Sequence, residues 1–526
     1  MKVLVSDNLS EQGIEVLKNA DGIEVDVKTG LSNEELIEII GQYDGLAIRS
    51  ATEVTADVIQ AASNLKVVGR AGIGVDNVDL GAASKRGVVV MNTPGGNTIT
   101  TAEHTISMML SLSRKIPQAT TSLKASKWEK KKFMGVEIYN KVLGIIGFGK
   151  IGQIVSSLAK GLQMNVIVYD PFISKDVIQK TGVEVVEQDG LFKRSDYISL
   201  HVPSTAHTKN LICEKTIKKM KSGVRIINCA RGDIINETDL LKAIKTKKVA
   251  GAALDVFEKE PPGENPLLLL DEVICTPHLG ASTDEAQENV AVAVAEQIVD
   301  YLKNGQIRNA INVPSVDAET LTKIKPYLYL GEKLGSLQAQ LCKGRIQQIN
   351  IIYSGEVAKM ETSPITLAVL KGLLNVFVET DLNMVNAPVI AKERGIEVLE
   401  SRSSESYDFT TLISVKITTD EESKTVEGTL FGKEDIRVVR IDEYHIEASP
   451  EGNMLVFSNV DSPGVVGKIG TILGKNNINI AGFNLSRRIV NGKAMAIVNL
   501  DSPLTDKAQD EINKISNIVF AKKISL

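Results

Sequence analysis

The sequence predicts an α/β protein with a doubly wound parallel sheet, followed by further α+β domains. Three observations support this prediction. Short aliphatic segments alternate with amphipathic stretches over 1–280, which is typical of βαβ units. A glycine-rich turn at 147–152 joins an apolar strand to a helix. The final segment, 449–526, has the order strand, helix, strand, strand, helix, strand, which favours a ferredoxin-like unit.

The first part of the chain predicts a smaller parallel sheet. Aliphatic segments around 2–7, 44–50 and 65–72 have the composition of buried strands, and the last two end near Arg49 and Arg70. A helix is expected over 284–305, where apolar residues recur at three- and four-residue spacing. This order suits a flavodoxin-like substrate domain, made from the start of the chain and a returning helix, into which the doubly wound domain is inserted.

The segment 317–448 reads as an intervening α+β domain. It has a strand-like stretch at 345–355, a helix-like stretch at 363–377 and a charged hairpin at 414–432. A turn-rich joint at 448–453 separates it from the ferredoxin-like unit. We therefore expect four domains, bounded as 1–98 with 287–316, then 99–286, 317–448 and 449–526.

Composition excludes several classes of function. A net charge of -5 gives no support for binding nucleic acid or a membrane surface, and no apolar run is long enough to span a bilayer. The chain enters a strand at once, without the features of a signal peptide, so a cytoplasmic protein is expected. The cysteines are far apart and predict neither a disulfide framework nor a metal site; they are Cys213, Cys229, Cys275 and Cys342.

The glycine-rich turn predicts a dinucleotide site. Gly147, Gly149 and Gly152 have G-x-G-x-x-G spacing after the strand 142–146, and Asp170 follows 18 residues past Gly152. The glycines would let the backbone approach a pyrophosphate at the helix N-terminus. Asp170 could accept both ribose hydroxyls and would repel a 2′-phosphate, which favours NAD over NADP. The alternative is a plain strand–turn–helix.

His278 lies in "TPHLGAST" and is one of only five histidines in the chain. Loops after neighbouring strands add Arg231 and Glu260. Hydride transfer to or from a hydroxyl-bearing carbon needs a base or acid near neutral pKa, which histidine provides. A carboxylate beside the imidazole would fix its tautomer and raise its pKa, and a guanidinium would hold the substrate carboxylate. The alternative is a surface ion pair beside an ordinary loop histidine.

With these residues, the chain resembles the D-isomer-specific 2-hydroxyacid dehydrogenases over nearly all of 1–310. The matching motifs are "VGRAGIGVDNVD", "MNTPGGN", "LGIIGFGKIG", "NCARGDIIN", "GAALDVFEKEPP" and "TPHLGAST". "IRSATEVTADVI" and "WEKKKFMG" narrow the resemblance to the branch that acts on phosphoglycerate, and the tail resembles its long form, with an intervening domain and an ACT domain.

The resemblance implies site residues. It assigns catalysis to Arg231, Glu260 and His278. NAD contacts would come from Gly147, Gly149, Lys150, Ile151, Gly152, Asp170, Cys229, Ala230, Arg231, Asp255, His278, Leu279, Gly280 and Ala281, with Asp255 meeting the nicotinamide carboxamide. Substrate contacts would come from Arg49, Arg70, Ile73, Gly74 and Lys130; Lys130 stands where some relatives carry arginine. An L-serine effector would contact Asn459, Asp461 and Asn479.

The implied activity is NAD-dependent oxidation of 3-phospho-D-glycerate to 3-phosphohydroxypyruvate, the first step of serine synthesis. Two alternatives remain open at this point: another D-2-hydroxyacid dehydrogenase, such as a glyoxylate or hydroxypyruvate reductase, and an NAD-sensing binding protein. The chain is expected to form a homodimer or homotetramer. Its cofactor domain would pair through a helix at 101–118 that is more apolar than a solvent-facing helix should be.

Overall fold

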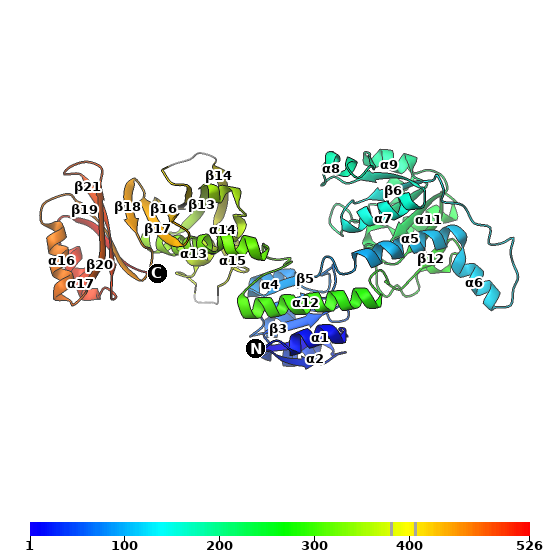
Figure 1. Cartoon of the computed structure of the whole chain (residues 1–526), viewed down its shortest axis with the longest axis horizontal. Helices are drawn as coiled ribbons and strands as arrows, with labels where there is room; N and C mark the ends of the chain where they lie inside the picture. Colours follow the sequence, from blue (N-terminus) through cyan, green and yellow to red (C-terminus); the bar gives the residue numbers. More distant parts are fainter. Residues whose placement is uncertain (379–381, 404–407) are drawn as a thin grey trace.

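The computed structural model describes residues 1–378, 382–403 and 408–526. Four sheets organise these residues, with five, seven, six and four strands. In Figure 1 they follow one another along the long axis, with the C-terminal unit at one end and the seven-stranded sheet at the other. The predicted sequence of α/β, α+β and ferredoxin-like units is confirmed.

The first sheet has the strand order β2-β1-β3-β4-β5 and is parallel throughout, as expected of a flavodoxin-like fold. The long helix α12 returns to this sheet and packs on it beside α1, where Gly13 lies so close to Ala291 that a Cβ would be 2.7 Å from its atoms. The strands and helices are β1 Lys2–Val5, α1 Glu11–Lys18, β2 Glu24–Val27, α2 Asn33–Ile39, η1 Ile40–Gln42, β3 Gly45–Ile48, α3 Ala56–Ala61, β4 Val67–Arg70, α4 Leu80–Arg86, β5 Val89–Asn92 and α12 Asp284–Asn304.

The second sheet has the order β12-β11-β10-β9-β6-β7-β8, a doubly wound parallel sheet whose strand order reverses between β6 and β9. Apolar clusters cover both of its faces. The elements are α5 Thr98–Arg114, α6 Ile116–Lys124, β6 Val142–Ile146, α7 Lys150–Gly161, β7 Asn165–Tyr169, α8 Lys175–Gln179, β8 Glu184–Val185, α9 Gln188–Arg194, β9 Tyr197–Leu200, α10 Glu214–Ile217, β10 Val224–Asn228, η2 Gly232–Ile234, α11 Glu237–Lys245, β11 Val249–Leu254, η3 Pro266–Leu269 and β12 Val273–Cys275.

The apolar stretch 101–118 differs from its prediction in one respect. Lys115 has a φ of 53°, a left-handed conformation that ends α5 and begins α6. Most apolar side chains of α5 are buried within its own domain, against α7 and the sheet. The apolar character of α5 is therefore explained by its own core.

The third sheet has the order β14-β13-β15-β16-β17-β18, and the predicted hairpin 414–432 is its antiparallel pair β15–β16. The long helix α13, which the sequence reading did not assign, packs against α14 and against strands of this sheet. The elements are α13 Ala318–Leu341, β13 Ile346–Gly355, η4 Glu356–Lys359, α14 Ser363–Leu374, α15 Ala387–Glu393, β14 Glu397–Ser403, β15 Thr411–Thr419, β16 Ser423–Phe431, β17 Asp435–Ile441 and β18 Tyr444–Ala448.

The last unit is a four-stranded antiparallel sheet of order β20-β21-β19-β22 with two helices, as predicted for βαββαβ. Its elements are β19 Asn453–Val460, α16 Val465–Lys475, β20 Ile480–Arg487, β21 Lys493–Leu500, α17 Asp506–Asn513 and β22 Ile518–Ser525. The core forms where both helices pack on one face of the sheet, around side chains such as Phe457 and Ile469.

Candidate active site

The predicted site residues of the seven-stranded sheet lie at one edge. Its strands are parallel, so the loops that follow β6, β7, β10, β11 and β12 all open where the strands end. These loops carry the glycine turn, Asp170, the segment 229–231, Asp255 and the segment 276–281. This is the edge where open α/β sheets bind ligands.

The glycine turn leaves no room for side chains where the backbone must pass closely. Gly147 has a φ of 92°, and a Cβ there would lie 2.4 Å from the carbonyl oxygen of His201. A Cβ on Gly152 would lie 2.3 Å from the carbonyl oxygen of Gly147. Gly149, the N-cap of α7, faces open space instead. The turn thus fits a diphosphate set against the N–H groups of Lys150 and Ile151, at the positive end of α7.

Asp170 lies beside the glycine turn. One carboxylate oxygen accepts the backbone N–H of Phe148 at 2.7 Å, and the other accepts the N–H groups of Phe172 at 2.8 Å and Ile173 at 3.1 Å. The carboxylate is therefore held at the end of β7, where the ribose of a dinucleotide is expected.

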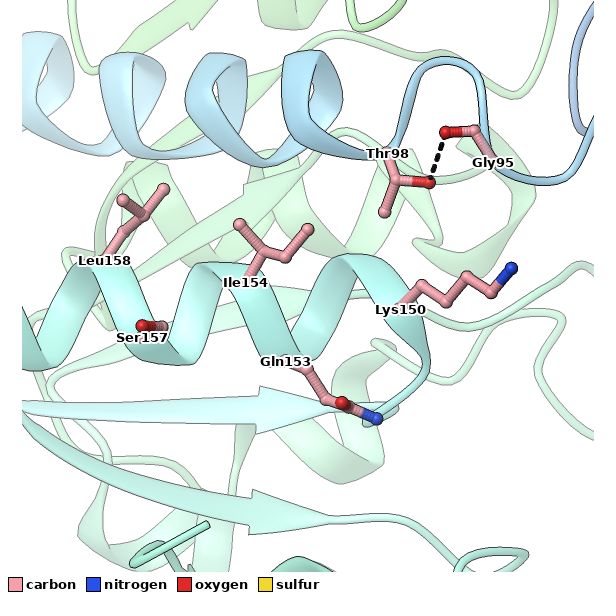
Figure 2. A pocket seen from close by; sticks show the side chains of 7 residues that line it. All are labelled: Gly95, Thr98, Lys150, Gln153, Ile154, Ser157 and Leu158. Carbon is pink, nitrogen blue, oxygen red and sulfur yellow. Dashed lines mark hydrogen bonds between the residues drawn. The ribbon is translucent and has the colours of Figure 1, made fainter.

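A pocket of about 540 Å³ adjoins this turn (Figure 2). It lies between the start of α5 and one side of α7, with Ile154 and Leu158 as its apolar wall and Lys150 at one end. Thr98 donates a hydrogen bond to the carbonyl oxygen of Gly95 at its rim. Lys150 is its one lining residue among the predicted cofactor contacts, so the pocket borders the cofactor cleft rather than forming it.

His278 and Glu260 meet as predicted from their residue types. Nδ1 of His278 lies 2.7 Å from a carboxylate oxygen of Glu260, whose other oxygen accepts the N–H of Phe257. The hydrogen bond to Glu260 raises the pKa of His278. Burial acts to raise the pKa of Glu260, but the hydrogen bonds from His278 and Phe257 outweigh it and lower that pKa. The carboxylate fixes the proton on Nδ1, which leaves Nε2 for a substrate.

Arg231 reaches across the cleft to the first domain. Its guanidinium lies against Gly74, where a Cβ would be 2.0 Å from one of its nitrogens, and its Nε donates to the carboxylate of Asp76 at 3.1 Å. Ile73 and Gly74 were predicted to contact the substrate, and a guanidinium was predicted to hold its carboxylate. In the structure, Arg231 thus pairs with a carboxylate of the protein itself, beside the predicted seat.

Arg49 and Arg70 lie at the same cleft as Arg231. Arg49 donates to the carbonyl oxygen of Asn8 and to Gln287 at 2.8 Å, and Arg70 donates to Asn77 at 3.1 Å. Burial and the positive charges of Arg231 and Arg49 lower the pKa of Arg70. Three guanidiniums therefore converge on the cleft between the first two domains.

Asp255 and Cys229 are buried beneath this cleft. The carboxylate of Asp255 has no exposed surface and accepts the N–H groups of Leu279 at 2.7 Å and Gly280 at 2.8 Å. It is turned toward the catalytic loop, so its contact with a carboxamide stays a prediction. Burial raises the pKa of Cys229 to about 12, which keeps it a neutral thiol.

The structure does not bring Lys130 to the cleft within one copy of the chain. Lys130 is exposed, on the segment that follows α6. In Figure 1, α6 and this segment extend from the side of the cofactor domain that faces away from the first sheet. Its contact with the substrate stays a prediction.

The predicted effector residues do not all meet within one copy either. Asn459 is the penultimate residue of β19 and is 2% exposed, and its side-chain oxygen has no partner among the described residues. Asp461 accepts from Arg487 at 2.6 Å. Asn479 precedes β20, whose start aligns through Leu500 with Asn453, at the other end of the sheet. Asn459 and Asp461 share one end, and Asn479 lies at the opposite one.

Sequence reasoning missed several side chains that shape the site. Asp76 was visible only as part of the glycine-rich segment 71–77. Nε2 of His104, on α5, lies 3.2 Å from Asp255 and also 3.2 Å from the hydroxyl of Thr276. Thr101 donates to the carbonyl oxygen of Gly280 at 2.8 Å. Their contacts join segments that are far apart in the sequence, so no local motif could predict these contacts.

The fold and the strand-end set define an NAD-dependent dehydrogenase of the D-2-hydroxyacid class. Residues 106–280 match the model of the D-isomer specific 2-hydroxyacid dehydrogenase NAD binding domain. The first two domains are similar to a glyoxylate reductase from Paecilomyes thermophila, at 29% identity and a TM-score of 0.55, covering 59% of this chain and 98% of that one. A D-lactate dehydrogenase from Escherichia coli is similar at 27% identity and a TM-score of 0.54, covering 59% of this chain and all of that one.

The remainder of the chain narrows the class. Residues 323–442 match the D-3-phosphoglycerate dehydrogenase intervening domain, and 453–517 match the ACT domain. The chain is 46% identical to D-3-phosphoglycerate dehydrogenase from Synechocystis sp., over all of this chain and 95% of that one, and 45% identical to that of Archaeoglobus fulgidus, over the whole of both. The chain belongs to the D-3-phosphoglycerate dehydrogenase family, and its cofactor is NAD.

Within the described residues, no helix has both the length and the apolar character needed to cross a bilayer.

Proposed function

We propose that this chain oxidises 3-phospho-D-glycerate to 3-phosphohydroxypyruvate, with Arg231, Glu260 and His278 as its catalytic residues. The observation that carries this assignment is the hydrogen-bonded pair His278–Glu260, which lies at the same sheet edge as Arg231 and the glycine turn. Family membership supports the reaction, since relatives that match this chain over its full length carry that name.

The acid–base role falls to His278. In the oxidation, its neutral Nε2 accepts the proton of the substrate C2 hydroxyl while the C2 hydrogen leaves as hydride. Glu260 stabilises the imidazolium that results. NAD, when bound at the glycine turn, supplies the hydride acceptor. In the reverse direction, the same imidazolium returns the proton to the keto oxygen.

Arg231 holds the substrate carboxylate. Its planar fork can donate two hydrogen bonds to a carboxylate, and Gly74 lies against its guanidinium. This grip orients C2 between His278 and the nicotinamide position. Because Asp76 already pairs with Arg231, the incoming carboxylate takes the place of an internal one.

Arg49 and Arg70 bind the substrate phosphate, with Lys130 as a further predicted contact. Several positive side chains at one cleft repel one another, which raises the free energy of the protein unless an anion binds there. Burial is the main cause that lowers the pKa of Arg70, and the positive charges of Arg231 and Arg49 lower it further. This favours a phosphorylated acid over the unphosphorylated substrates of a glyoxylate or hydroxypyruvate reductase.

The test is NADH formation from NAD and 3-phosphoglycerate, by the wild type and by His278→Ala. We expect turnover by the wild type, and normal NAD binding with most turnover lost in the variant. Turnover with unphosphorylated acids alone would move the chain to the reductase class. NAD binding without turnover of any acid would make it an NAD-sensing protein. Normal turnover by His278→Ala would remove the catalytic assignment.

For the ACT domain we propose L-serine as effector. Asn459 supports this, because a buried amide oxygen without a partner is a ready acceptor for an ammonium group. Asp461 adds negative charge nearby, although Arg487 now neutralises it. Because Asn479 lies at the opposite end of the sheet, we propose that it joins them from a second copy, with the effector between two ACT domains. Serine should inhibit the wild type, and Asn459→Ala should lose that inhibition while it retains catalysis; inhibition equal to that of the wild type would refute the site.

We also propose a homo-oligomer, which an exposed apolar surface supports. The segment from α6 to about residue 139 exposes large apolar side chains, including Trp128 at 82% and Met134 at 76%. Such a patch usually marks an interface. We propose that this patch binds a second copy of the chain. Sedimentation of Trp128→Asp should show a smaller species than the wild type.

We propose the following roles for the domains. Residues 1–98 and 287–316 bind the substrate, 99–286 bind the cofactor, 317–448 form the intervening domain and 449–526 bind the effector.

A further inference from the structure

A group of titratable side chains lies beneath the catalytic loop. In the part of the chain that the structure describes, His104, Cys229 and Asp255 are the one cluster whose ligand-type atoms all lie within 4.8 Å of one another. Cys229 and Asp255 are buried, and His104 is partly so. Such clusters serve either as metal sites or as hydrogen-bonded supports.

The contacts of Asp255 favour the second role. One of its oxygens accepts from the Thr276 hydroxyl at 2.5 Å and from the N–H of Leu279, and the other accepts from the N–H of Gly280. These bonds occupy three of the roughly four lone-pair sites of the carboxylate. Burial also raises the pKa of Cys229, which disfavours the thiolate that a metal would bind. The cluster is a support for the loop 276–280.

The loop needs such support because of His278 itself. Its φ of 54° places a non-glycine residue in the left-handed region, which persists only where the surroundings determine it. The backbone N–H of His278 donates to the carbonyl oxygen of Asp255 at 2.9 Å. Asp255 thus holds His278 through its backbone carbonyl, and its carboxylate holds Thr276 on one side of His278 and Leu279 and Gly280 on the other.

His104 in turn orients Asp255. The Thr276 hydroxyl has one proton and gives it to the carboxylate, so Nε2 of His104, 3.2 Å from each of them, is the donor of the remaining contact. One turn earlier on the same face of α5, Thr101 donates to the carbonyl oxygen of Gly280. α5 starts where the chain crosses from the first sheet to the second (Figure 1). This helix holds the catalytic loop through the contacts of Thr101 and His104.

We propose that His104 is a positioning residue for catalysis, which acts on His278 by fixing the Asp255 carboxylate that carries the loop 276–280. This inference rests on the proposed acid–base role of His278. His104 does not touch the substrate in this scheme. Its removal leaves Asp255 free to turn, and the loop then holds His278 less accurately against Glu260 and the substrate. A small misplacement of a catalytic group costs a large factor in rate.

The experiment compares His104→Leu with His104→Gln in the full-length enzyme. Glutamine keeps an N–H donor at similar reach, whereas leucine fills the space without one. We expect His104→Leu to lower kcat about ten-fold or more, with a smaller change in KM for 3-phosphoglycerate. His104→Gln should recover most of the loss. A merely structural role would affect both variants through folding, which thermal unfolding and NAD binding would reveal.

The pH profile provides a second readout. Glu260, Asp255 and Arg231 are the charged groups that face His278, and Glu260 has the largest influence on its pKa. If the loop loosens, the contact with Glu260 weakens, so the acid limb of kcat/KM should move to lower pH in His104→Leu and remain in place in His104→Gln. Thr276→Val, which removes the shared hydroxyl, should shift the limb in the same direction and serves if His104→Leu does not fold.

Two results would overturn the proposal: a kcat of His104→Leu within about two-fold of the wild type with an unmoved limb, or a His104→Gln enzyme as impaired as His104→Leu. Failure of the proposed substrate looks different, since the wild type itself would then not oxidise 3-phosphoglycerate. In that case the same variants, compared on whichever 2-hydroxy acid is oxidised, still decide the role of His104.

Discussion

Replacing Glu260 with glutamine should shift the pH dependence of the reaction in a defined direction. The hydrogen bond from Nδ1 of His278 to Glu260 is 2.7 Å long, and it raises the pKa of His278 above 6.5. Oxidation requires neutral His278, so the wild-type acid limb lies at higher pH than for a free histidine, and rates rise as the pH passes through it. Loss of the carboxylate removes this effect, and the limb moves to lower pH.

The size of the shift follows from the exposure of the pair. A hydrogen bond to a charged group contributes about 1.5–3 kcal/mol. The side chains are 52% and 37% exposed, so solvent screening reduces the effect to roughly 1 kcal/mol. Loss of this interaction should therefore move the limb to lower pH. Because glutamine also presents a donor to Nδ1 and can select the wrong tautomer, kcat should fall about 100-fold as well.

The assay is steady-state NADH formation across the neutral pH range, with the nearby Glu258→Gln as the charge-matched control. Glu258→Gln should leave the limb where it is, since its carboxylate is not the one that pairs with His278. A Glu260→Gln limb that stays in place, or moves to higher pH, would refute the reasoning.

Three further predictions concern other parts of the site. Asp76→Asn should lower KM for 3-phosphoglycerate by up to about five-fold, because an exposed ion pair of at most roughly 1 kcal/mol no longer competes for Arg231; a higher KM would show instead that Asp76 helps to orient the arginine. Gly152→Ala should weaken NAD binding and lower the free energy of unfolding by about 1–3 kcal/mol, because its Cβ would meet the carbonyl oxygen of Gly147. A Cβ on Gly161, in the same helix, meets nothing within 4 Å, so Gly161→Ala should have neither effect. Equal effects of the two variants in titration calorimetry and thermal unfolding would contradict this. Burial lowers the pKa of His201 to about 4, so its imidazole resonances should not titrate near neutral pH, and a midpoint close to that of a free histidine would show that the end of β9 is open to water.

Most of the fold could be predicted because hydrophobic spacing is local. The strand 142–146 and the helix after it were identified from consecutive residues, and the structure places β6 and α7 there. The break at Lys115 was not predicted, since nothing in its residue type requires a left-handed backbone there. The helix α13 was also missed, although its packing against α14 shapes the third domain.

In the candidate site, too, the residues of local motifs could be predicted and the long-range contacts could not. His278, Glu260 and Arg231 each follow a recognisable strand, so their meeting could be inferred from parallel topology. The support under the loop could not, because His104 reaches Asp255 only when α5 packs on the sheet, more than a hundred residues earlier in the chain. The separation of Asn479 from Asn459 depends on strand order, which composition does not reveal.

The central claim is that the cleft selects a phosphorylated 2-hydroxy acid. The most direct test is the ratio of kcat/KM for 3-phosphoglycerate to that for D-glycerate, measured with saturating NAD. Two guanidinium contacts to the phosphate, each contributing about 1.5–3 kcal/mol, predict a ratio of about 100 or more. A ratio near one, or a preference for D-glycerate, would contradict the account.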